Sequence, residues 1–145
     1  MPKFRSPLTL APLLALAIAS PFAQADDVSA DKLAQALGVP GLQVKAVPKR
    51  RPQQVNQDYA VSNSKGEAIA AIIQAPPASF ADWKQLPDFK TLSGLGQEAY
   101  ERPEMSQTCA RGTKYAACLT LMPGAFPAGK QPSQQQIKAA LTTLI

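Results

Sequence analysis

Histidine is absent from all 145 residues of this sequence. Histidine is the usual general base of hydrolytic triads and a common metal ligand, so its absence excludes Ser-His-Asp and Cys-His catalysis and imidazole-based metal sites. The two cysteines are too few for a four-thiolate zinc site, and no complete glycine-rich phosphate loop is present. The sequence therefore predicts no catalytic residues, no metal site and no cofactor.

Long apolar runs are also lacking, except near the start of the chain. Residues 8–19 are almost continuously apolar, and they follow Lys3 and Arg5. Small residues at Ala23 and Ala25 then offer a signal-peptidase site, so the sequence predicts a cleaved signal peptide over residues 1–25 with cleavage near Ala25. The expected location is the periplasm, or outside the cell if the protein is released.

The rest of the chain resembles one small domain. No segment provides the about 20 apolar residues that a membrane-spanning helix needs, so we expect no transmembrane segment. Residues 26–145 have the commonest size of a single domain with one core. We therefore expect a single small α+β domain with one disulfide.

No acidic residue occurs between Asp31 and Asp58, and one short segment of this stretch contains four cations: Lys45, Lys49, Arg50 and Arg51. Removal of the leader leaves 13 basic and 10 acidic side chains, a net charge of +3. Export argues against a nucleic-acid partner, so this basic segment is expected to approach a protein or an anionic envelope component. The alternative is a solvated loop between two strands.

The two cysteines, Cys109 and Cys118, are predicted to form a disulfide. Residues 105–110 and 116–122 have the composition of strands, and the residues between them can form a turn. Such a hairpin places the two cysteines opposite or nearly opposite each other. Their spacing does not resemble the Cys-x-x-Cys of redox-active pairs.

Periodicity and turn residues predict helices at both ends and in the middle of the mature chain. Ser29 and Ser133 are expected to cap the first and last helices, and Ser79 with Asp82 is close to a capping box for the middle helix. The fold class is α+β, an antiparallel sheet with helices packed on one face. The expected helices are 30–37, 80–86 and a C-terminal helix after Ser133, and the expected strands are 42–48, 55–62, 67–74, 99–102, 105–110 and 116–122.

Carboxylates provide the alternative function, a small hydrolase of the cell envelope. Glu98, Glu101 and Glu104 are spaced by three, and Asp82 and Asp88 lie nearby in the sequence. A pair of converging carboxylates could hydrolyse a glycosidic bond. Three-residue spacing groups side chains on a helix and separates them on a strand, so an exposed acidic rim is the favoured interpretation.

The stretch from Leu92 to Tyr100 contains a Gly-Leu-Gly-x-x-Ala-Tyr turn that leads into a strand. With the hairpin and helix that follow, residues 92–145 resemble small exported bacterial domains of the PsbP-like type. That resemblance implies an α/β sandwich with a binding or accessory role and transfers no catalytic residue. Gly94 and Gly96 are expected to permit a tight backbone path, and Tyr100 to anchor the strand in the core.

Phe126 lies in the proline- and glycine-rich segment 123–132. Its ring either packs under the C-terminal helix, which is favoured, or projects as a contact residue. The candidate binding residues are therefore Phe126 and the four cations of the basic segment. Together these features predict an exported, non-catalytic binding protein, such as an inhibitor or an envelope accessory factor, and leave its partner and oligomeric state open.

Overall fold

The computed structural model describes residues 28–145. The predicted signal peptide, 1–25, and its cleavage site near Ala25 lie outside these residues. Within the described part, no helix is long and apolar enough to cross a membrane. In chain order the elements are α1 (Ala30–Leu37), β1 (Gln43–Val47), β2 (Gln57–Ser62), β3 (Ala68–Ala75), α2 (Ser79–Trp83), β4 (Lys90–Leu92), β5 (Glu98–Arg102), the 3₁₀ turn η1 (Pro103–Met105), β6 (Gln107–Arg111), β7 (Ala116–Leu121) and α3 (Gln134–Thr142).

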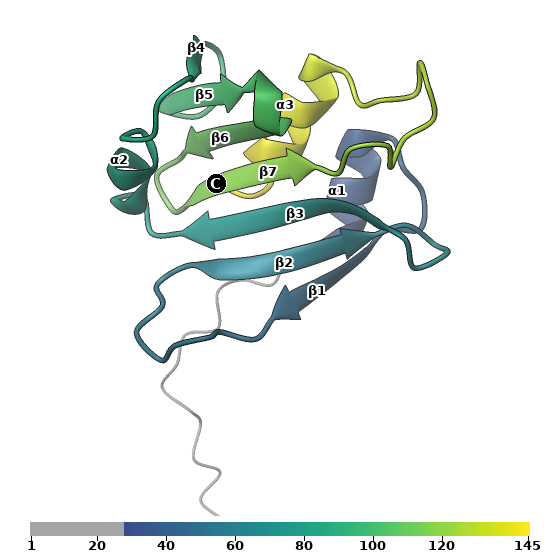
Figure 1. Cartoon of the computed structure of the whole chain (residues 1–145), viewed down its shortest axis with the longest axis horizontal. Coiled ribbons are helices and arrows are strands. Elements are labelled where there is room, and N and C mark those ends of the chain that lie inside the picture. The colour runs from purple at the N-terminus through teal and green to yellow at the C-terminus, as the bar shows by residue number, and fades with distance from the viewer. Residues whose placement is uncertain (1–27) are drawn as a thin grey trace, which may run out of the picture.

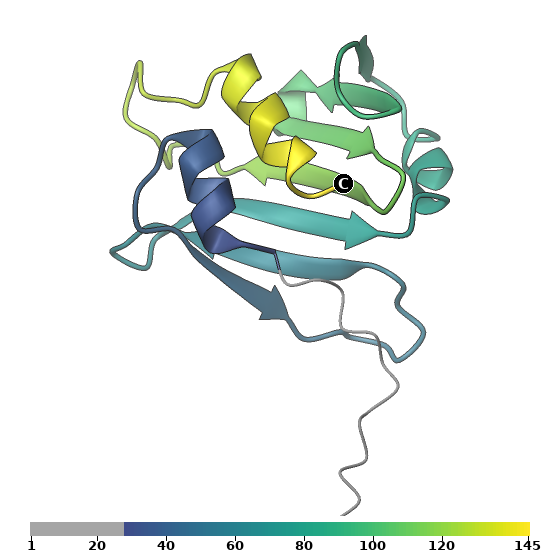
Figure 2. The ribbon, with the colours of Figure 1, turned by 180° about the vertical axis from the view of Figure 1, so that it is seen from behind.

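All seven strands form one antiparallel sheet in the order β1-β2-β3-β7-β6-β5-β4 (Figure 1). The order joins two meanders, β1 to β3 and β4 to β7, through the pairing of β3 with β7. The predicted α+β class, with an antiparallel sheet and helices at both ends and in the middle, is confirmed. Helices α1 and α3 lie side by side over one face of the sheet (Figure 2).

The two terminal helices begin where their capping residues predict. The Ser29 side chain accepts from the N–H of Lys32, and Gly38 ends α1 with a left-handed φ of 69°. Ser133 and Gln136 form the complete capping box of α3. Both helices turn their apolar faces to the sheet, which satisfies the amphipathic pattern of the sequence. The core residues from these segments are Leu33, Leu37, Ala140, Leu141 and Leu144, and they pack on Val61, Ile72 and Leu119.

The middle of the chain departs from the sequence-based expectations. Helix α2 ends at Trp83, and its N-cap is Ala78, which has no side-chain capping bond. The expected capping box of Ser79 and Asp82 is therefore wrong, because Ser79 already lies inside the helix. Residues 90–92, which belong to none of the expected helices or strands, form the edge strand β4. Helix α2 lies at one end of the sheet (Figure 1), where Phe80 joins a second, smaller cluster with Tyr100.

The predicted disulfide between Cys109 and Cys118 is confirmed, with Cα atoms 4.0 Å apart. The two residues face each other directly across β6 and β7. Gly112 N–H donates to Tyr115 C=O at 2.8 Å, so these two residues form a hydrogen-bonded pair. Hydrogen-bonded and non-hydrogen-bonded pairs alternate along an antiparallel ladder, and Cys109 and Cys118 therefore form a non-hydrogen-bonded pair. Both are buried in the cluster around Phe80, on the face of the sheet opposite to α1 and α3.

Replacing both cysteines with alanine should lower the free energy of unfolding by about 2 to 3 kcal/mol, because the bridge restricts the unfolded chain. Denaturant unfolding of the wild-type protein with and without reductant gives the same comparison. Reductant should leave the double variant unchanged. A loss well below 1 kcal/mol in both experiments would contradict a stabilising role for the bridge.

Two glycines in the turn between β4 and β5 have different surroundings. Both have positive φ, 73° at Gly94 and 56° at Gly96. A Cβ at Gly96 would lie 2.5 Å from the carbonyl oxygen of Arg111, whereas a Cβ at Gly94 would meet nothing within 4 Å. Gln97 N–H donates to that same carbonyl at 2.8 Å. The expected tight backbone path is therefore found at Gly96.

Gly96→Ala should consequently destabilise the protein more than Gly94→Ala. Both substitutions add a Cβ in the left-handed region, at a cost of about 1 kcal/mol. Gly96→Ala must also displace the end of β6, which adds about 1 to 3 kcal/mol. Thermal or denaturant unfolding of the two variants tests this difference, and equal stabilities would show that the close approach does not constrain the turn.

Candidate binding surface

The basic segment of the sequence forms the end of β1 and the long loop to β2. Lys45 is exposed on β1, and Lys49, Arg50 and Arg51 are exposed in the loop. Gln54 makes two hydrogen bonds within this loop. Its side-chain oxygen accepts from the main-chain N–H of Arg50 at 3.3 Å, and its main-chain N–H donates to the carbonyl oxygen of Arg51 at 3.1 Å. Lys49, Arg50 and Arg51 are therefore presented by a loop with defined local contacts, and Lys45 by the strand before it.

The loop encloses an open hollow of about 680 Å³. Of residues 28–145, those that line it are Arg50, Arg51, Gln53 and Gln54, which supply guanidinium and amide donors. None of the four cations of the basic segment forms an ion pair with any residue in 28–145. Planar guanidinium groups match the paired oxygens of carboxylates and phosphates. The surface can therefore bind oxyanions without first breaking an internal ion pair.

Phe126 does not join this surface. The β1–β2 loop lies at the end of the sheet where β7 begins, and the loop that carries Phe126 follows the other end of β7 (Figure 1). The Phe126 side chain is partly buried and packs against the main core, to which α3 contributes Ala140 and Leu141. The structure thus separates the two groups of candidate binding residues to opposite ends of the sheet.

Glu98 and Glu101, two of the acidic residues of the alternative function, do not converge. Glu98 and Glu101 both belong to β5, where their odd spacing places them on opposite faces of the sheet. Glu101 accepts a hydrogen bond from Gln134 of α3, while Glu104 is exposed in the 3₁₀ turn. Within residues 28–145, no group of three or more acidic or cysteine side chains could hold a metal ion. This arrangement does not favour a hydrolase based on paired carboxylates.

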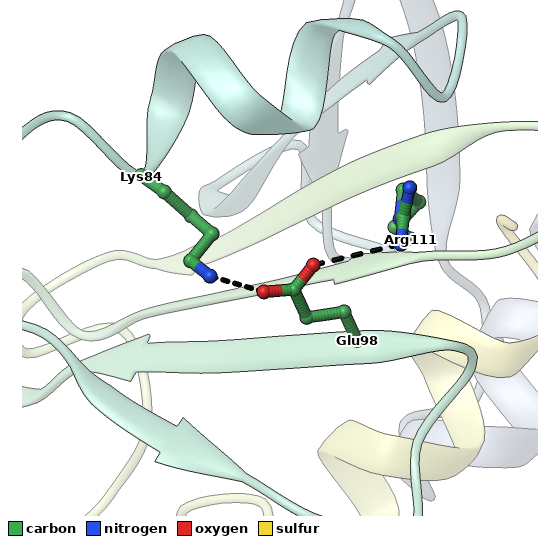
Figure 3. A network of polar contacts seen from close by, with 3 residues as sticks. All are labelled: Lys84, Glu98 and Arg111. Carbon is green, nitrogen blue, oxygen red and sulfur yellow. Dashed lines mark hydrogen bonds and ion pairs between the residues drawn. The ribbon is translucent and has the colours of Figure 1, made fainter.

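Glu98 instead bridges two cations (Figure 3). Its carboxylate pairs with Lys84, which follows α2, and with Arg111 at the end of β6, where the N···O distance is 3.6 Å. The three side chains border a hollow of about 280 Å³ beside Pro77 and Phe80. Each side chain is about one third exposed. The cluster connects α2 to two strands, and no local sequence pattern could have revealed it because its members are far apart in the chain.

A buried arginine provides the second attachment of this region. Arg102 is only 5% exposed and donates to the carbonyl oxygens of Trp83 at 2.7 Å and Leu86 at 3.4 Å. Its guanidinium carbon lies 4.9 Å from the ring centre of Tyr100. Burial raises the pKa of Tyr100 above its ordinary value, and the nearby Arg102 charge partly opposes that rise. Arg102 thus holds the end of α2 against the sheet, which identifies it as a structural residue.

Comparisons of the chain with protein-family models, with curated proteins and with solved structures find no match. The resemblance of residues 92–145 to PsbP-like domains therefore stays a prediction. The class that the fold and the surface define is an α+β domain with an exposed basic loop.

Glu98→Gln should destabilise the protein by about 0.5 to 1 kcal/mol, because partly exposed ion pairs contribute little and Lys84 and Arg111 would face each other without the carboxylate. Denaturant unfolding at low and at high salt tests this. The difference between wild type and variant should shrink at about 1 M salt, where charges are screened. A difference that salt does not change would assign the effect to packing.

Proposed function

We propose that this chain is an exported, non-catalytic binding protein that recognises an anionic partner through its basic loop. The single observation that carries the proposal is the set of exposed cations Lys45, Lys49, Arg50 and Arg51, none of which forms an ion pair within the described residues, 28–145. Two of them, Arg50 and Arg51, line an open hollow together with Gln53 and Gln54, and its guanidinium and amide donors match the chemistry of an oxyanion. The partner is accordingly an acidic protein or an anionic component of the cell envelope.

The proposed compartment is the periplasm or the extracellular space, after removal of residues 1–25. The signal-peptide pattern supports it, and so does the disulfide between Cys109 and Cys118, since such bridges persist in oxidising compartments. The geometry of the acidic residues favours binding over catalysis, because Glu98 and Glu101 lie on opposite faces of one strand and Glu98 is paired with two cations.

The test is binding of purified protein to two anionic probes, poly-L-glutamate and phosphatidylglycerol vesicles. The triple variant of Lys49, Arg50 and Arg51 to alanine should bind the preferred probe about 10- to 100-fold more weakly, because each cation near an anionic surface contributes about 1 kcal/mol. Co-sedimentation measures vesicle binding, and a titration followed by Trp83 fluorescence measures binding of the polypeptide.

A matched variant controls for net charge. Lys65, Lys90 and Lys130 are exposed and belong to other parts of the surface. Changing these three to alanine removes the same charge and should leave the affinity within about twofold of wild type. If both triple variants lose affinity equally, or if the wild-type protein binds neither probe, the basic loop is not the recognition site.

A further inference from the structure

Strand β1 is an edge of the sheet. Within residues 28–145 it pairs with β2 alone, so its other side faces no partner strand. A free edge presents unpaired main-chain N–H and C=O groups, and a strand of another chain can bind them. The opposite edge, β4, is only three residues long, whereas β1 offers five. β1 is therefore the better template for an added strand.

The registers identify which groups face outward. Met122 N–H donates to Ile69 C=O at 2.9 Å, so the odd-numbered residues of β3 bond toward β7 and the even-numbered ones toward β2. In the β2–β3 register the even-numbered residues of β3 lie opposite odd-numbered residues of β2, so the even-numbered residues of β2 bond toward β1. In the β1–β2 register these lie opposite the odd-numbered residues of β1. The main-chain groups of Val44 and Ala46 therefore point away from β2. These two residues can form a ladder with an incoming strand.

The charge of the edge selects the partner. Lys45 lies at the centre of β1 and is exposed on the face opposite to α1 and α3. Antiparallel pairing of two copies about this centre would set one Lys45 against the other, which is unfavourable. A residue added opposite Lys45 would occupy a closely spaced, non-hydrogen-bonded position, where an acidic side chain is favourable. Self-association is thus opposed, and an acidic strand is favoured.

The neighbouring residues extend this preference along the strand. Val47 lies on the same face as Lys45 and is 38% exposed, so it offers an apolar contact two residues further on. Beyond Val47 the chain enters the loop with Lys49, Arg50 and Arg51. An antiparallel partner would therefore present acids first, at the loop, then an apolar residue opposite Val47, and then an acid opposite Lys45.

We propose that β1 binds an extended acidic segment of a partner protein as an additional edge strand, with the basic loop holding the acids that precede it. This inference rests on the proposed function and names the partner of the same surface. It assigns main-chain recognition to Val44 and Ala46 and charge recognition to Lys45 and the loop.

The probe is the capped peptide Glu-Glu-Glu-Val-Thr-Glu-Thr, which follows this order. Wild-type protein should bind it, and the peptide with both threonines replaced by proline should bind at least about tenfold more weakly, because the ladder then loses its donors from the peptide. A peptide with every glutamate replaced by glutamine tests the charge contribution. Equal affinity for the threonine and proline peptides would overturn the strand inference.

The matching protein variants are Ala46→Pro, which removes an outward N–H that the fold does not use, and Ala46→Ser, which keeps it. Ala46→Pro should weaken peptide binding at least about tenfold and leave binding of poly-L-glutamate within about twofold, whereas Ala46→Ser should change neither. If Ala46→Pro binds the peptide as wild type does, the edge is not used. If the wild-type protein binds neither the peptide, nor poly-L-glutamate, nor phosphatidylglycerol vesicles, the proposed function is instead refuted.

Amide hydrogen exchange of the wild-type protein gives a measurement that does not depend on the folding of a variant. On addition of the peptide, the N–H groups of Val44 and Ala46 should become protected by about tenfold or more. The outward groups of β4 serve as the internal reference and should not change. Peptide binding without protection at Val44 and Ala46 would show that the peptide contacts the loop alone and would overturn the strand inference.

Discussion

The pairing of β3 with β7 is the contact on which the rest of this structure depends. Within the described chain, it is the one connection in the sheet between the two meanders, and it runs from Ala70–Leu121 to Ala75–Ala116. Ile72 and Leu119 face α1 and α3 from this pair, while Ile73 and Cys118 face the second cluster. Both clusters are therefore built across the same two strands. The disulfide on β7 limits the movement of β6 relative to β7 and so fixes the register of that pair.

Features governed by short-range chemistry could be predicted from the sequence. The side chains of Ser29 and Ser133 satisfy helix N–H groups within three residues, and Cys109 and Cys118 are brought together by a local turn. The order of strands in the sheet is different in kind, because it depends on contacts between distant segments. The cluster of Lys84, Glu98 and Arg111 escaped prediction for that reason, and β4 did so because three residues carry too little periodicity. The capping box of Ser79 and Asp82 was predicted wrongly because the pattern of a serine followed by an acid is the same at an N-cap and inside a helix.

Some features of the candidate surface likewise follow from the local sequence, whereas others depend on contacts between distant segments. The clustering of Lys49, Arg50 and Arg51 and the lack of nearby acids are visible in the sequence. The position of these cations beside an open sheet edge is not, since any of the strands could have been the outer one. Nor could the sequence place Phe126 at the other end of the sheet, or show that Glu98 and Glu101 point to opposite faces before their strand was located. The proposed recognition therefore depends on topology as much as on composition.

The packing of α1 against α3 has a consequence for how the chain reaches this structure. α1 is the first described element and α3 the last, and both contribute to one core. During synthesis, Leu33 and Leu37 emerge long before the residues that bury them. The apolar strand β3 likewise emerges before β7, so one of its edges is unpaired until β7 has been synthesised. An unfinished chain is thus expected to expose an open strand edge that favours intermolecular pairing. The native fold is therefore expected to form only after α3 has been synthesised, and a factor that shields β3 until then would protect the nascent chain from aggregation.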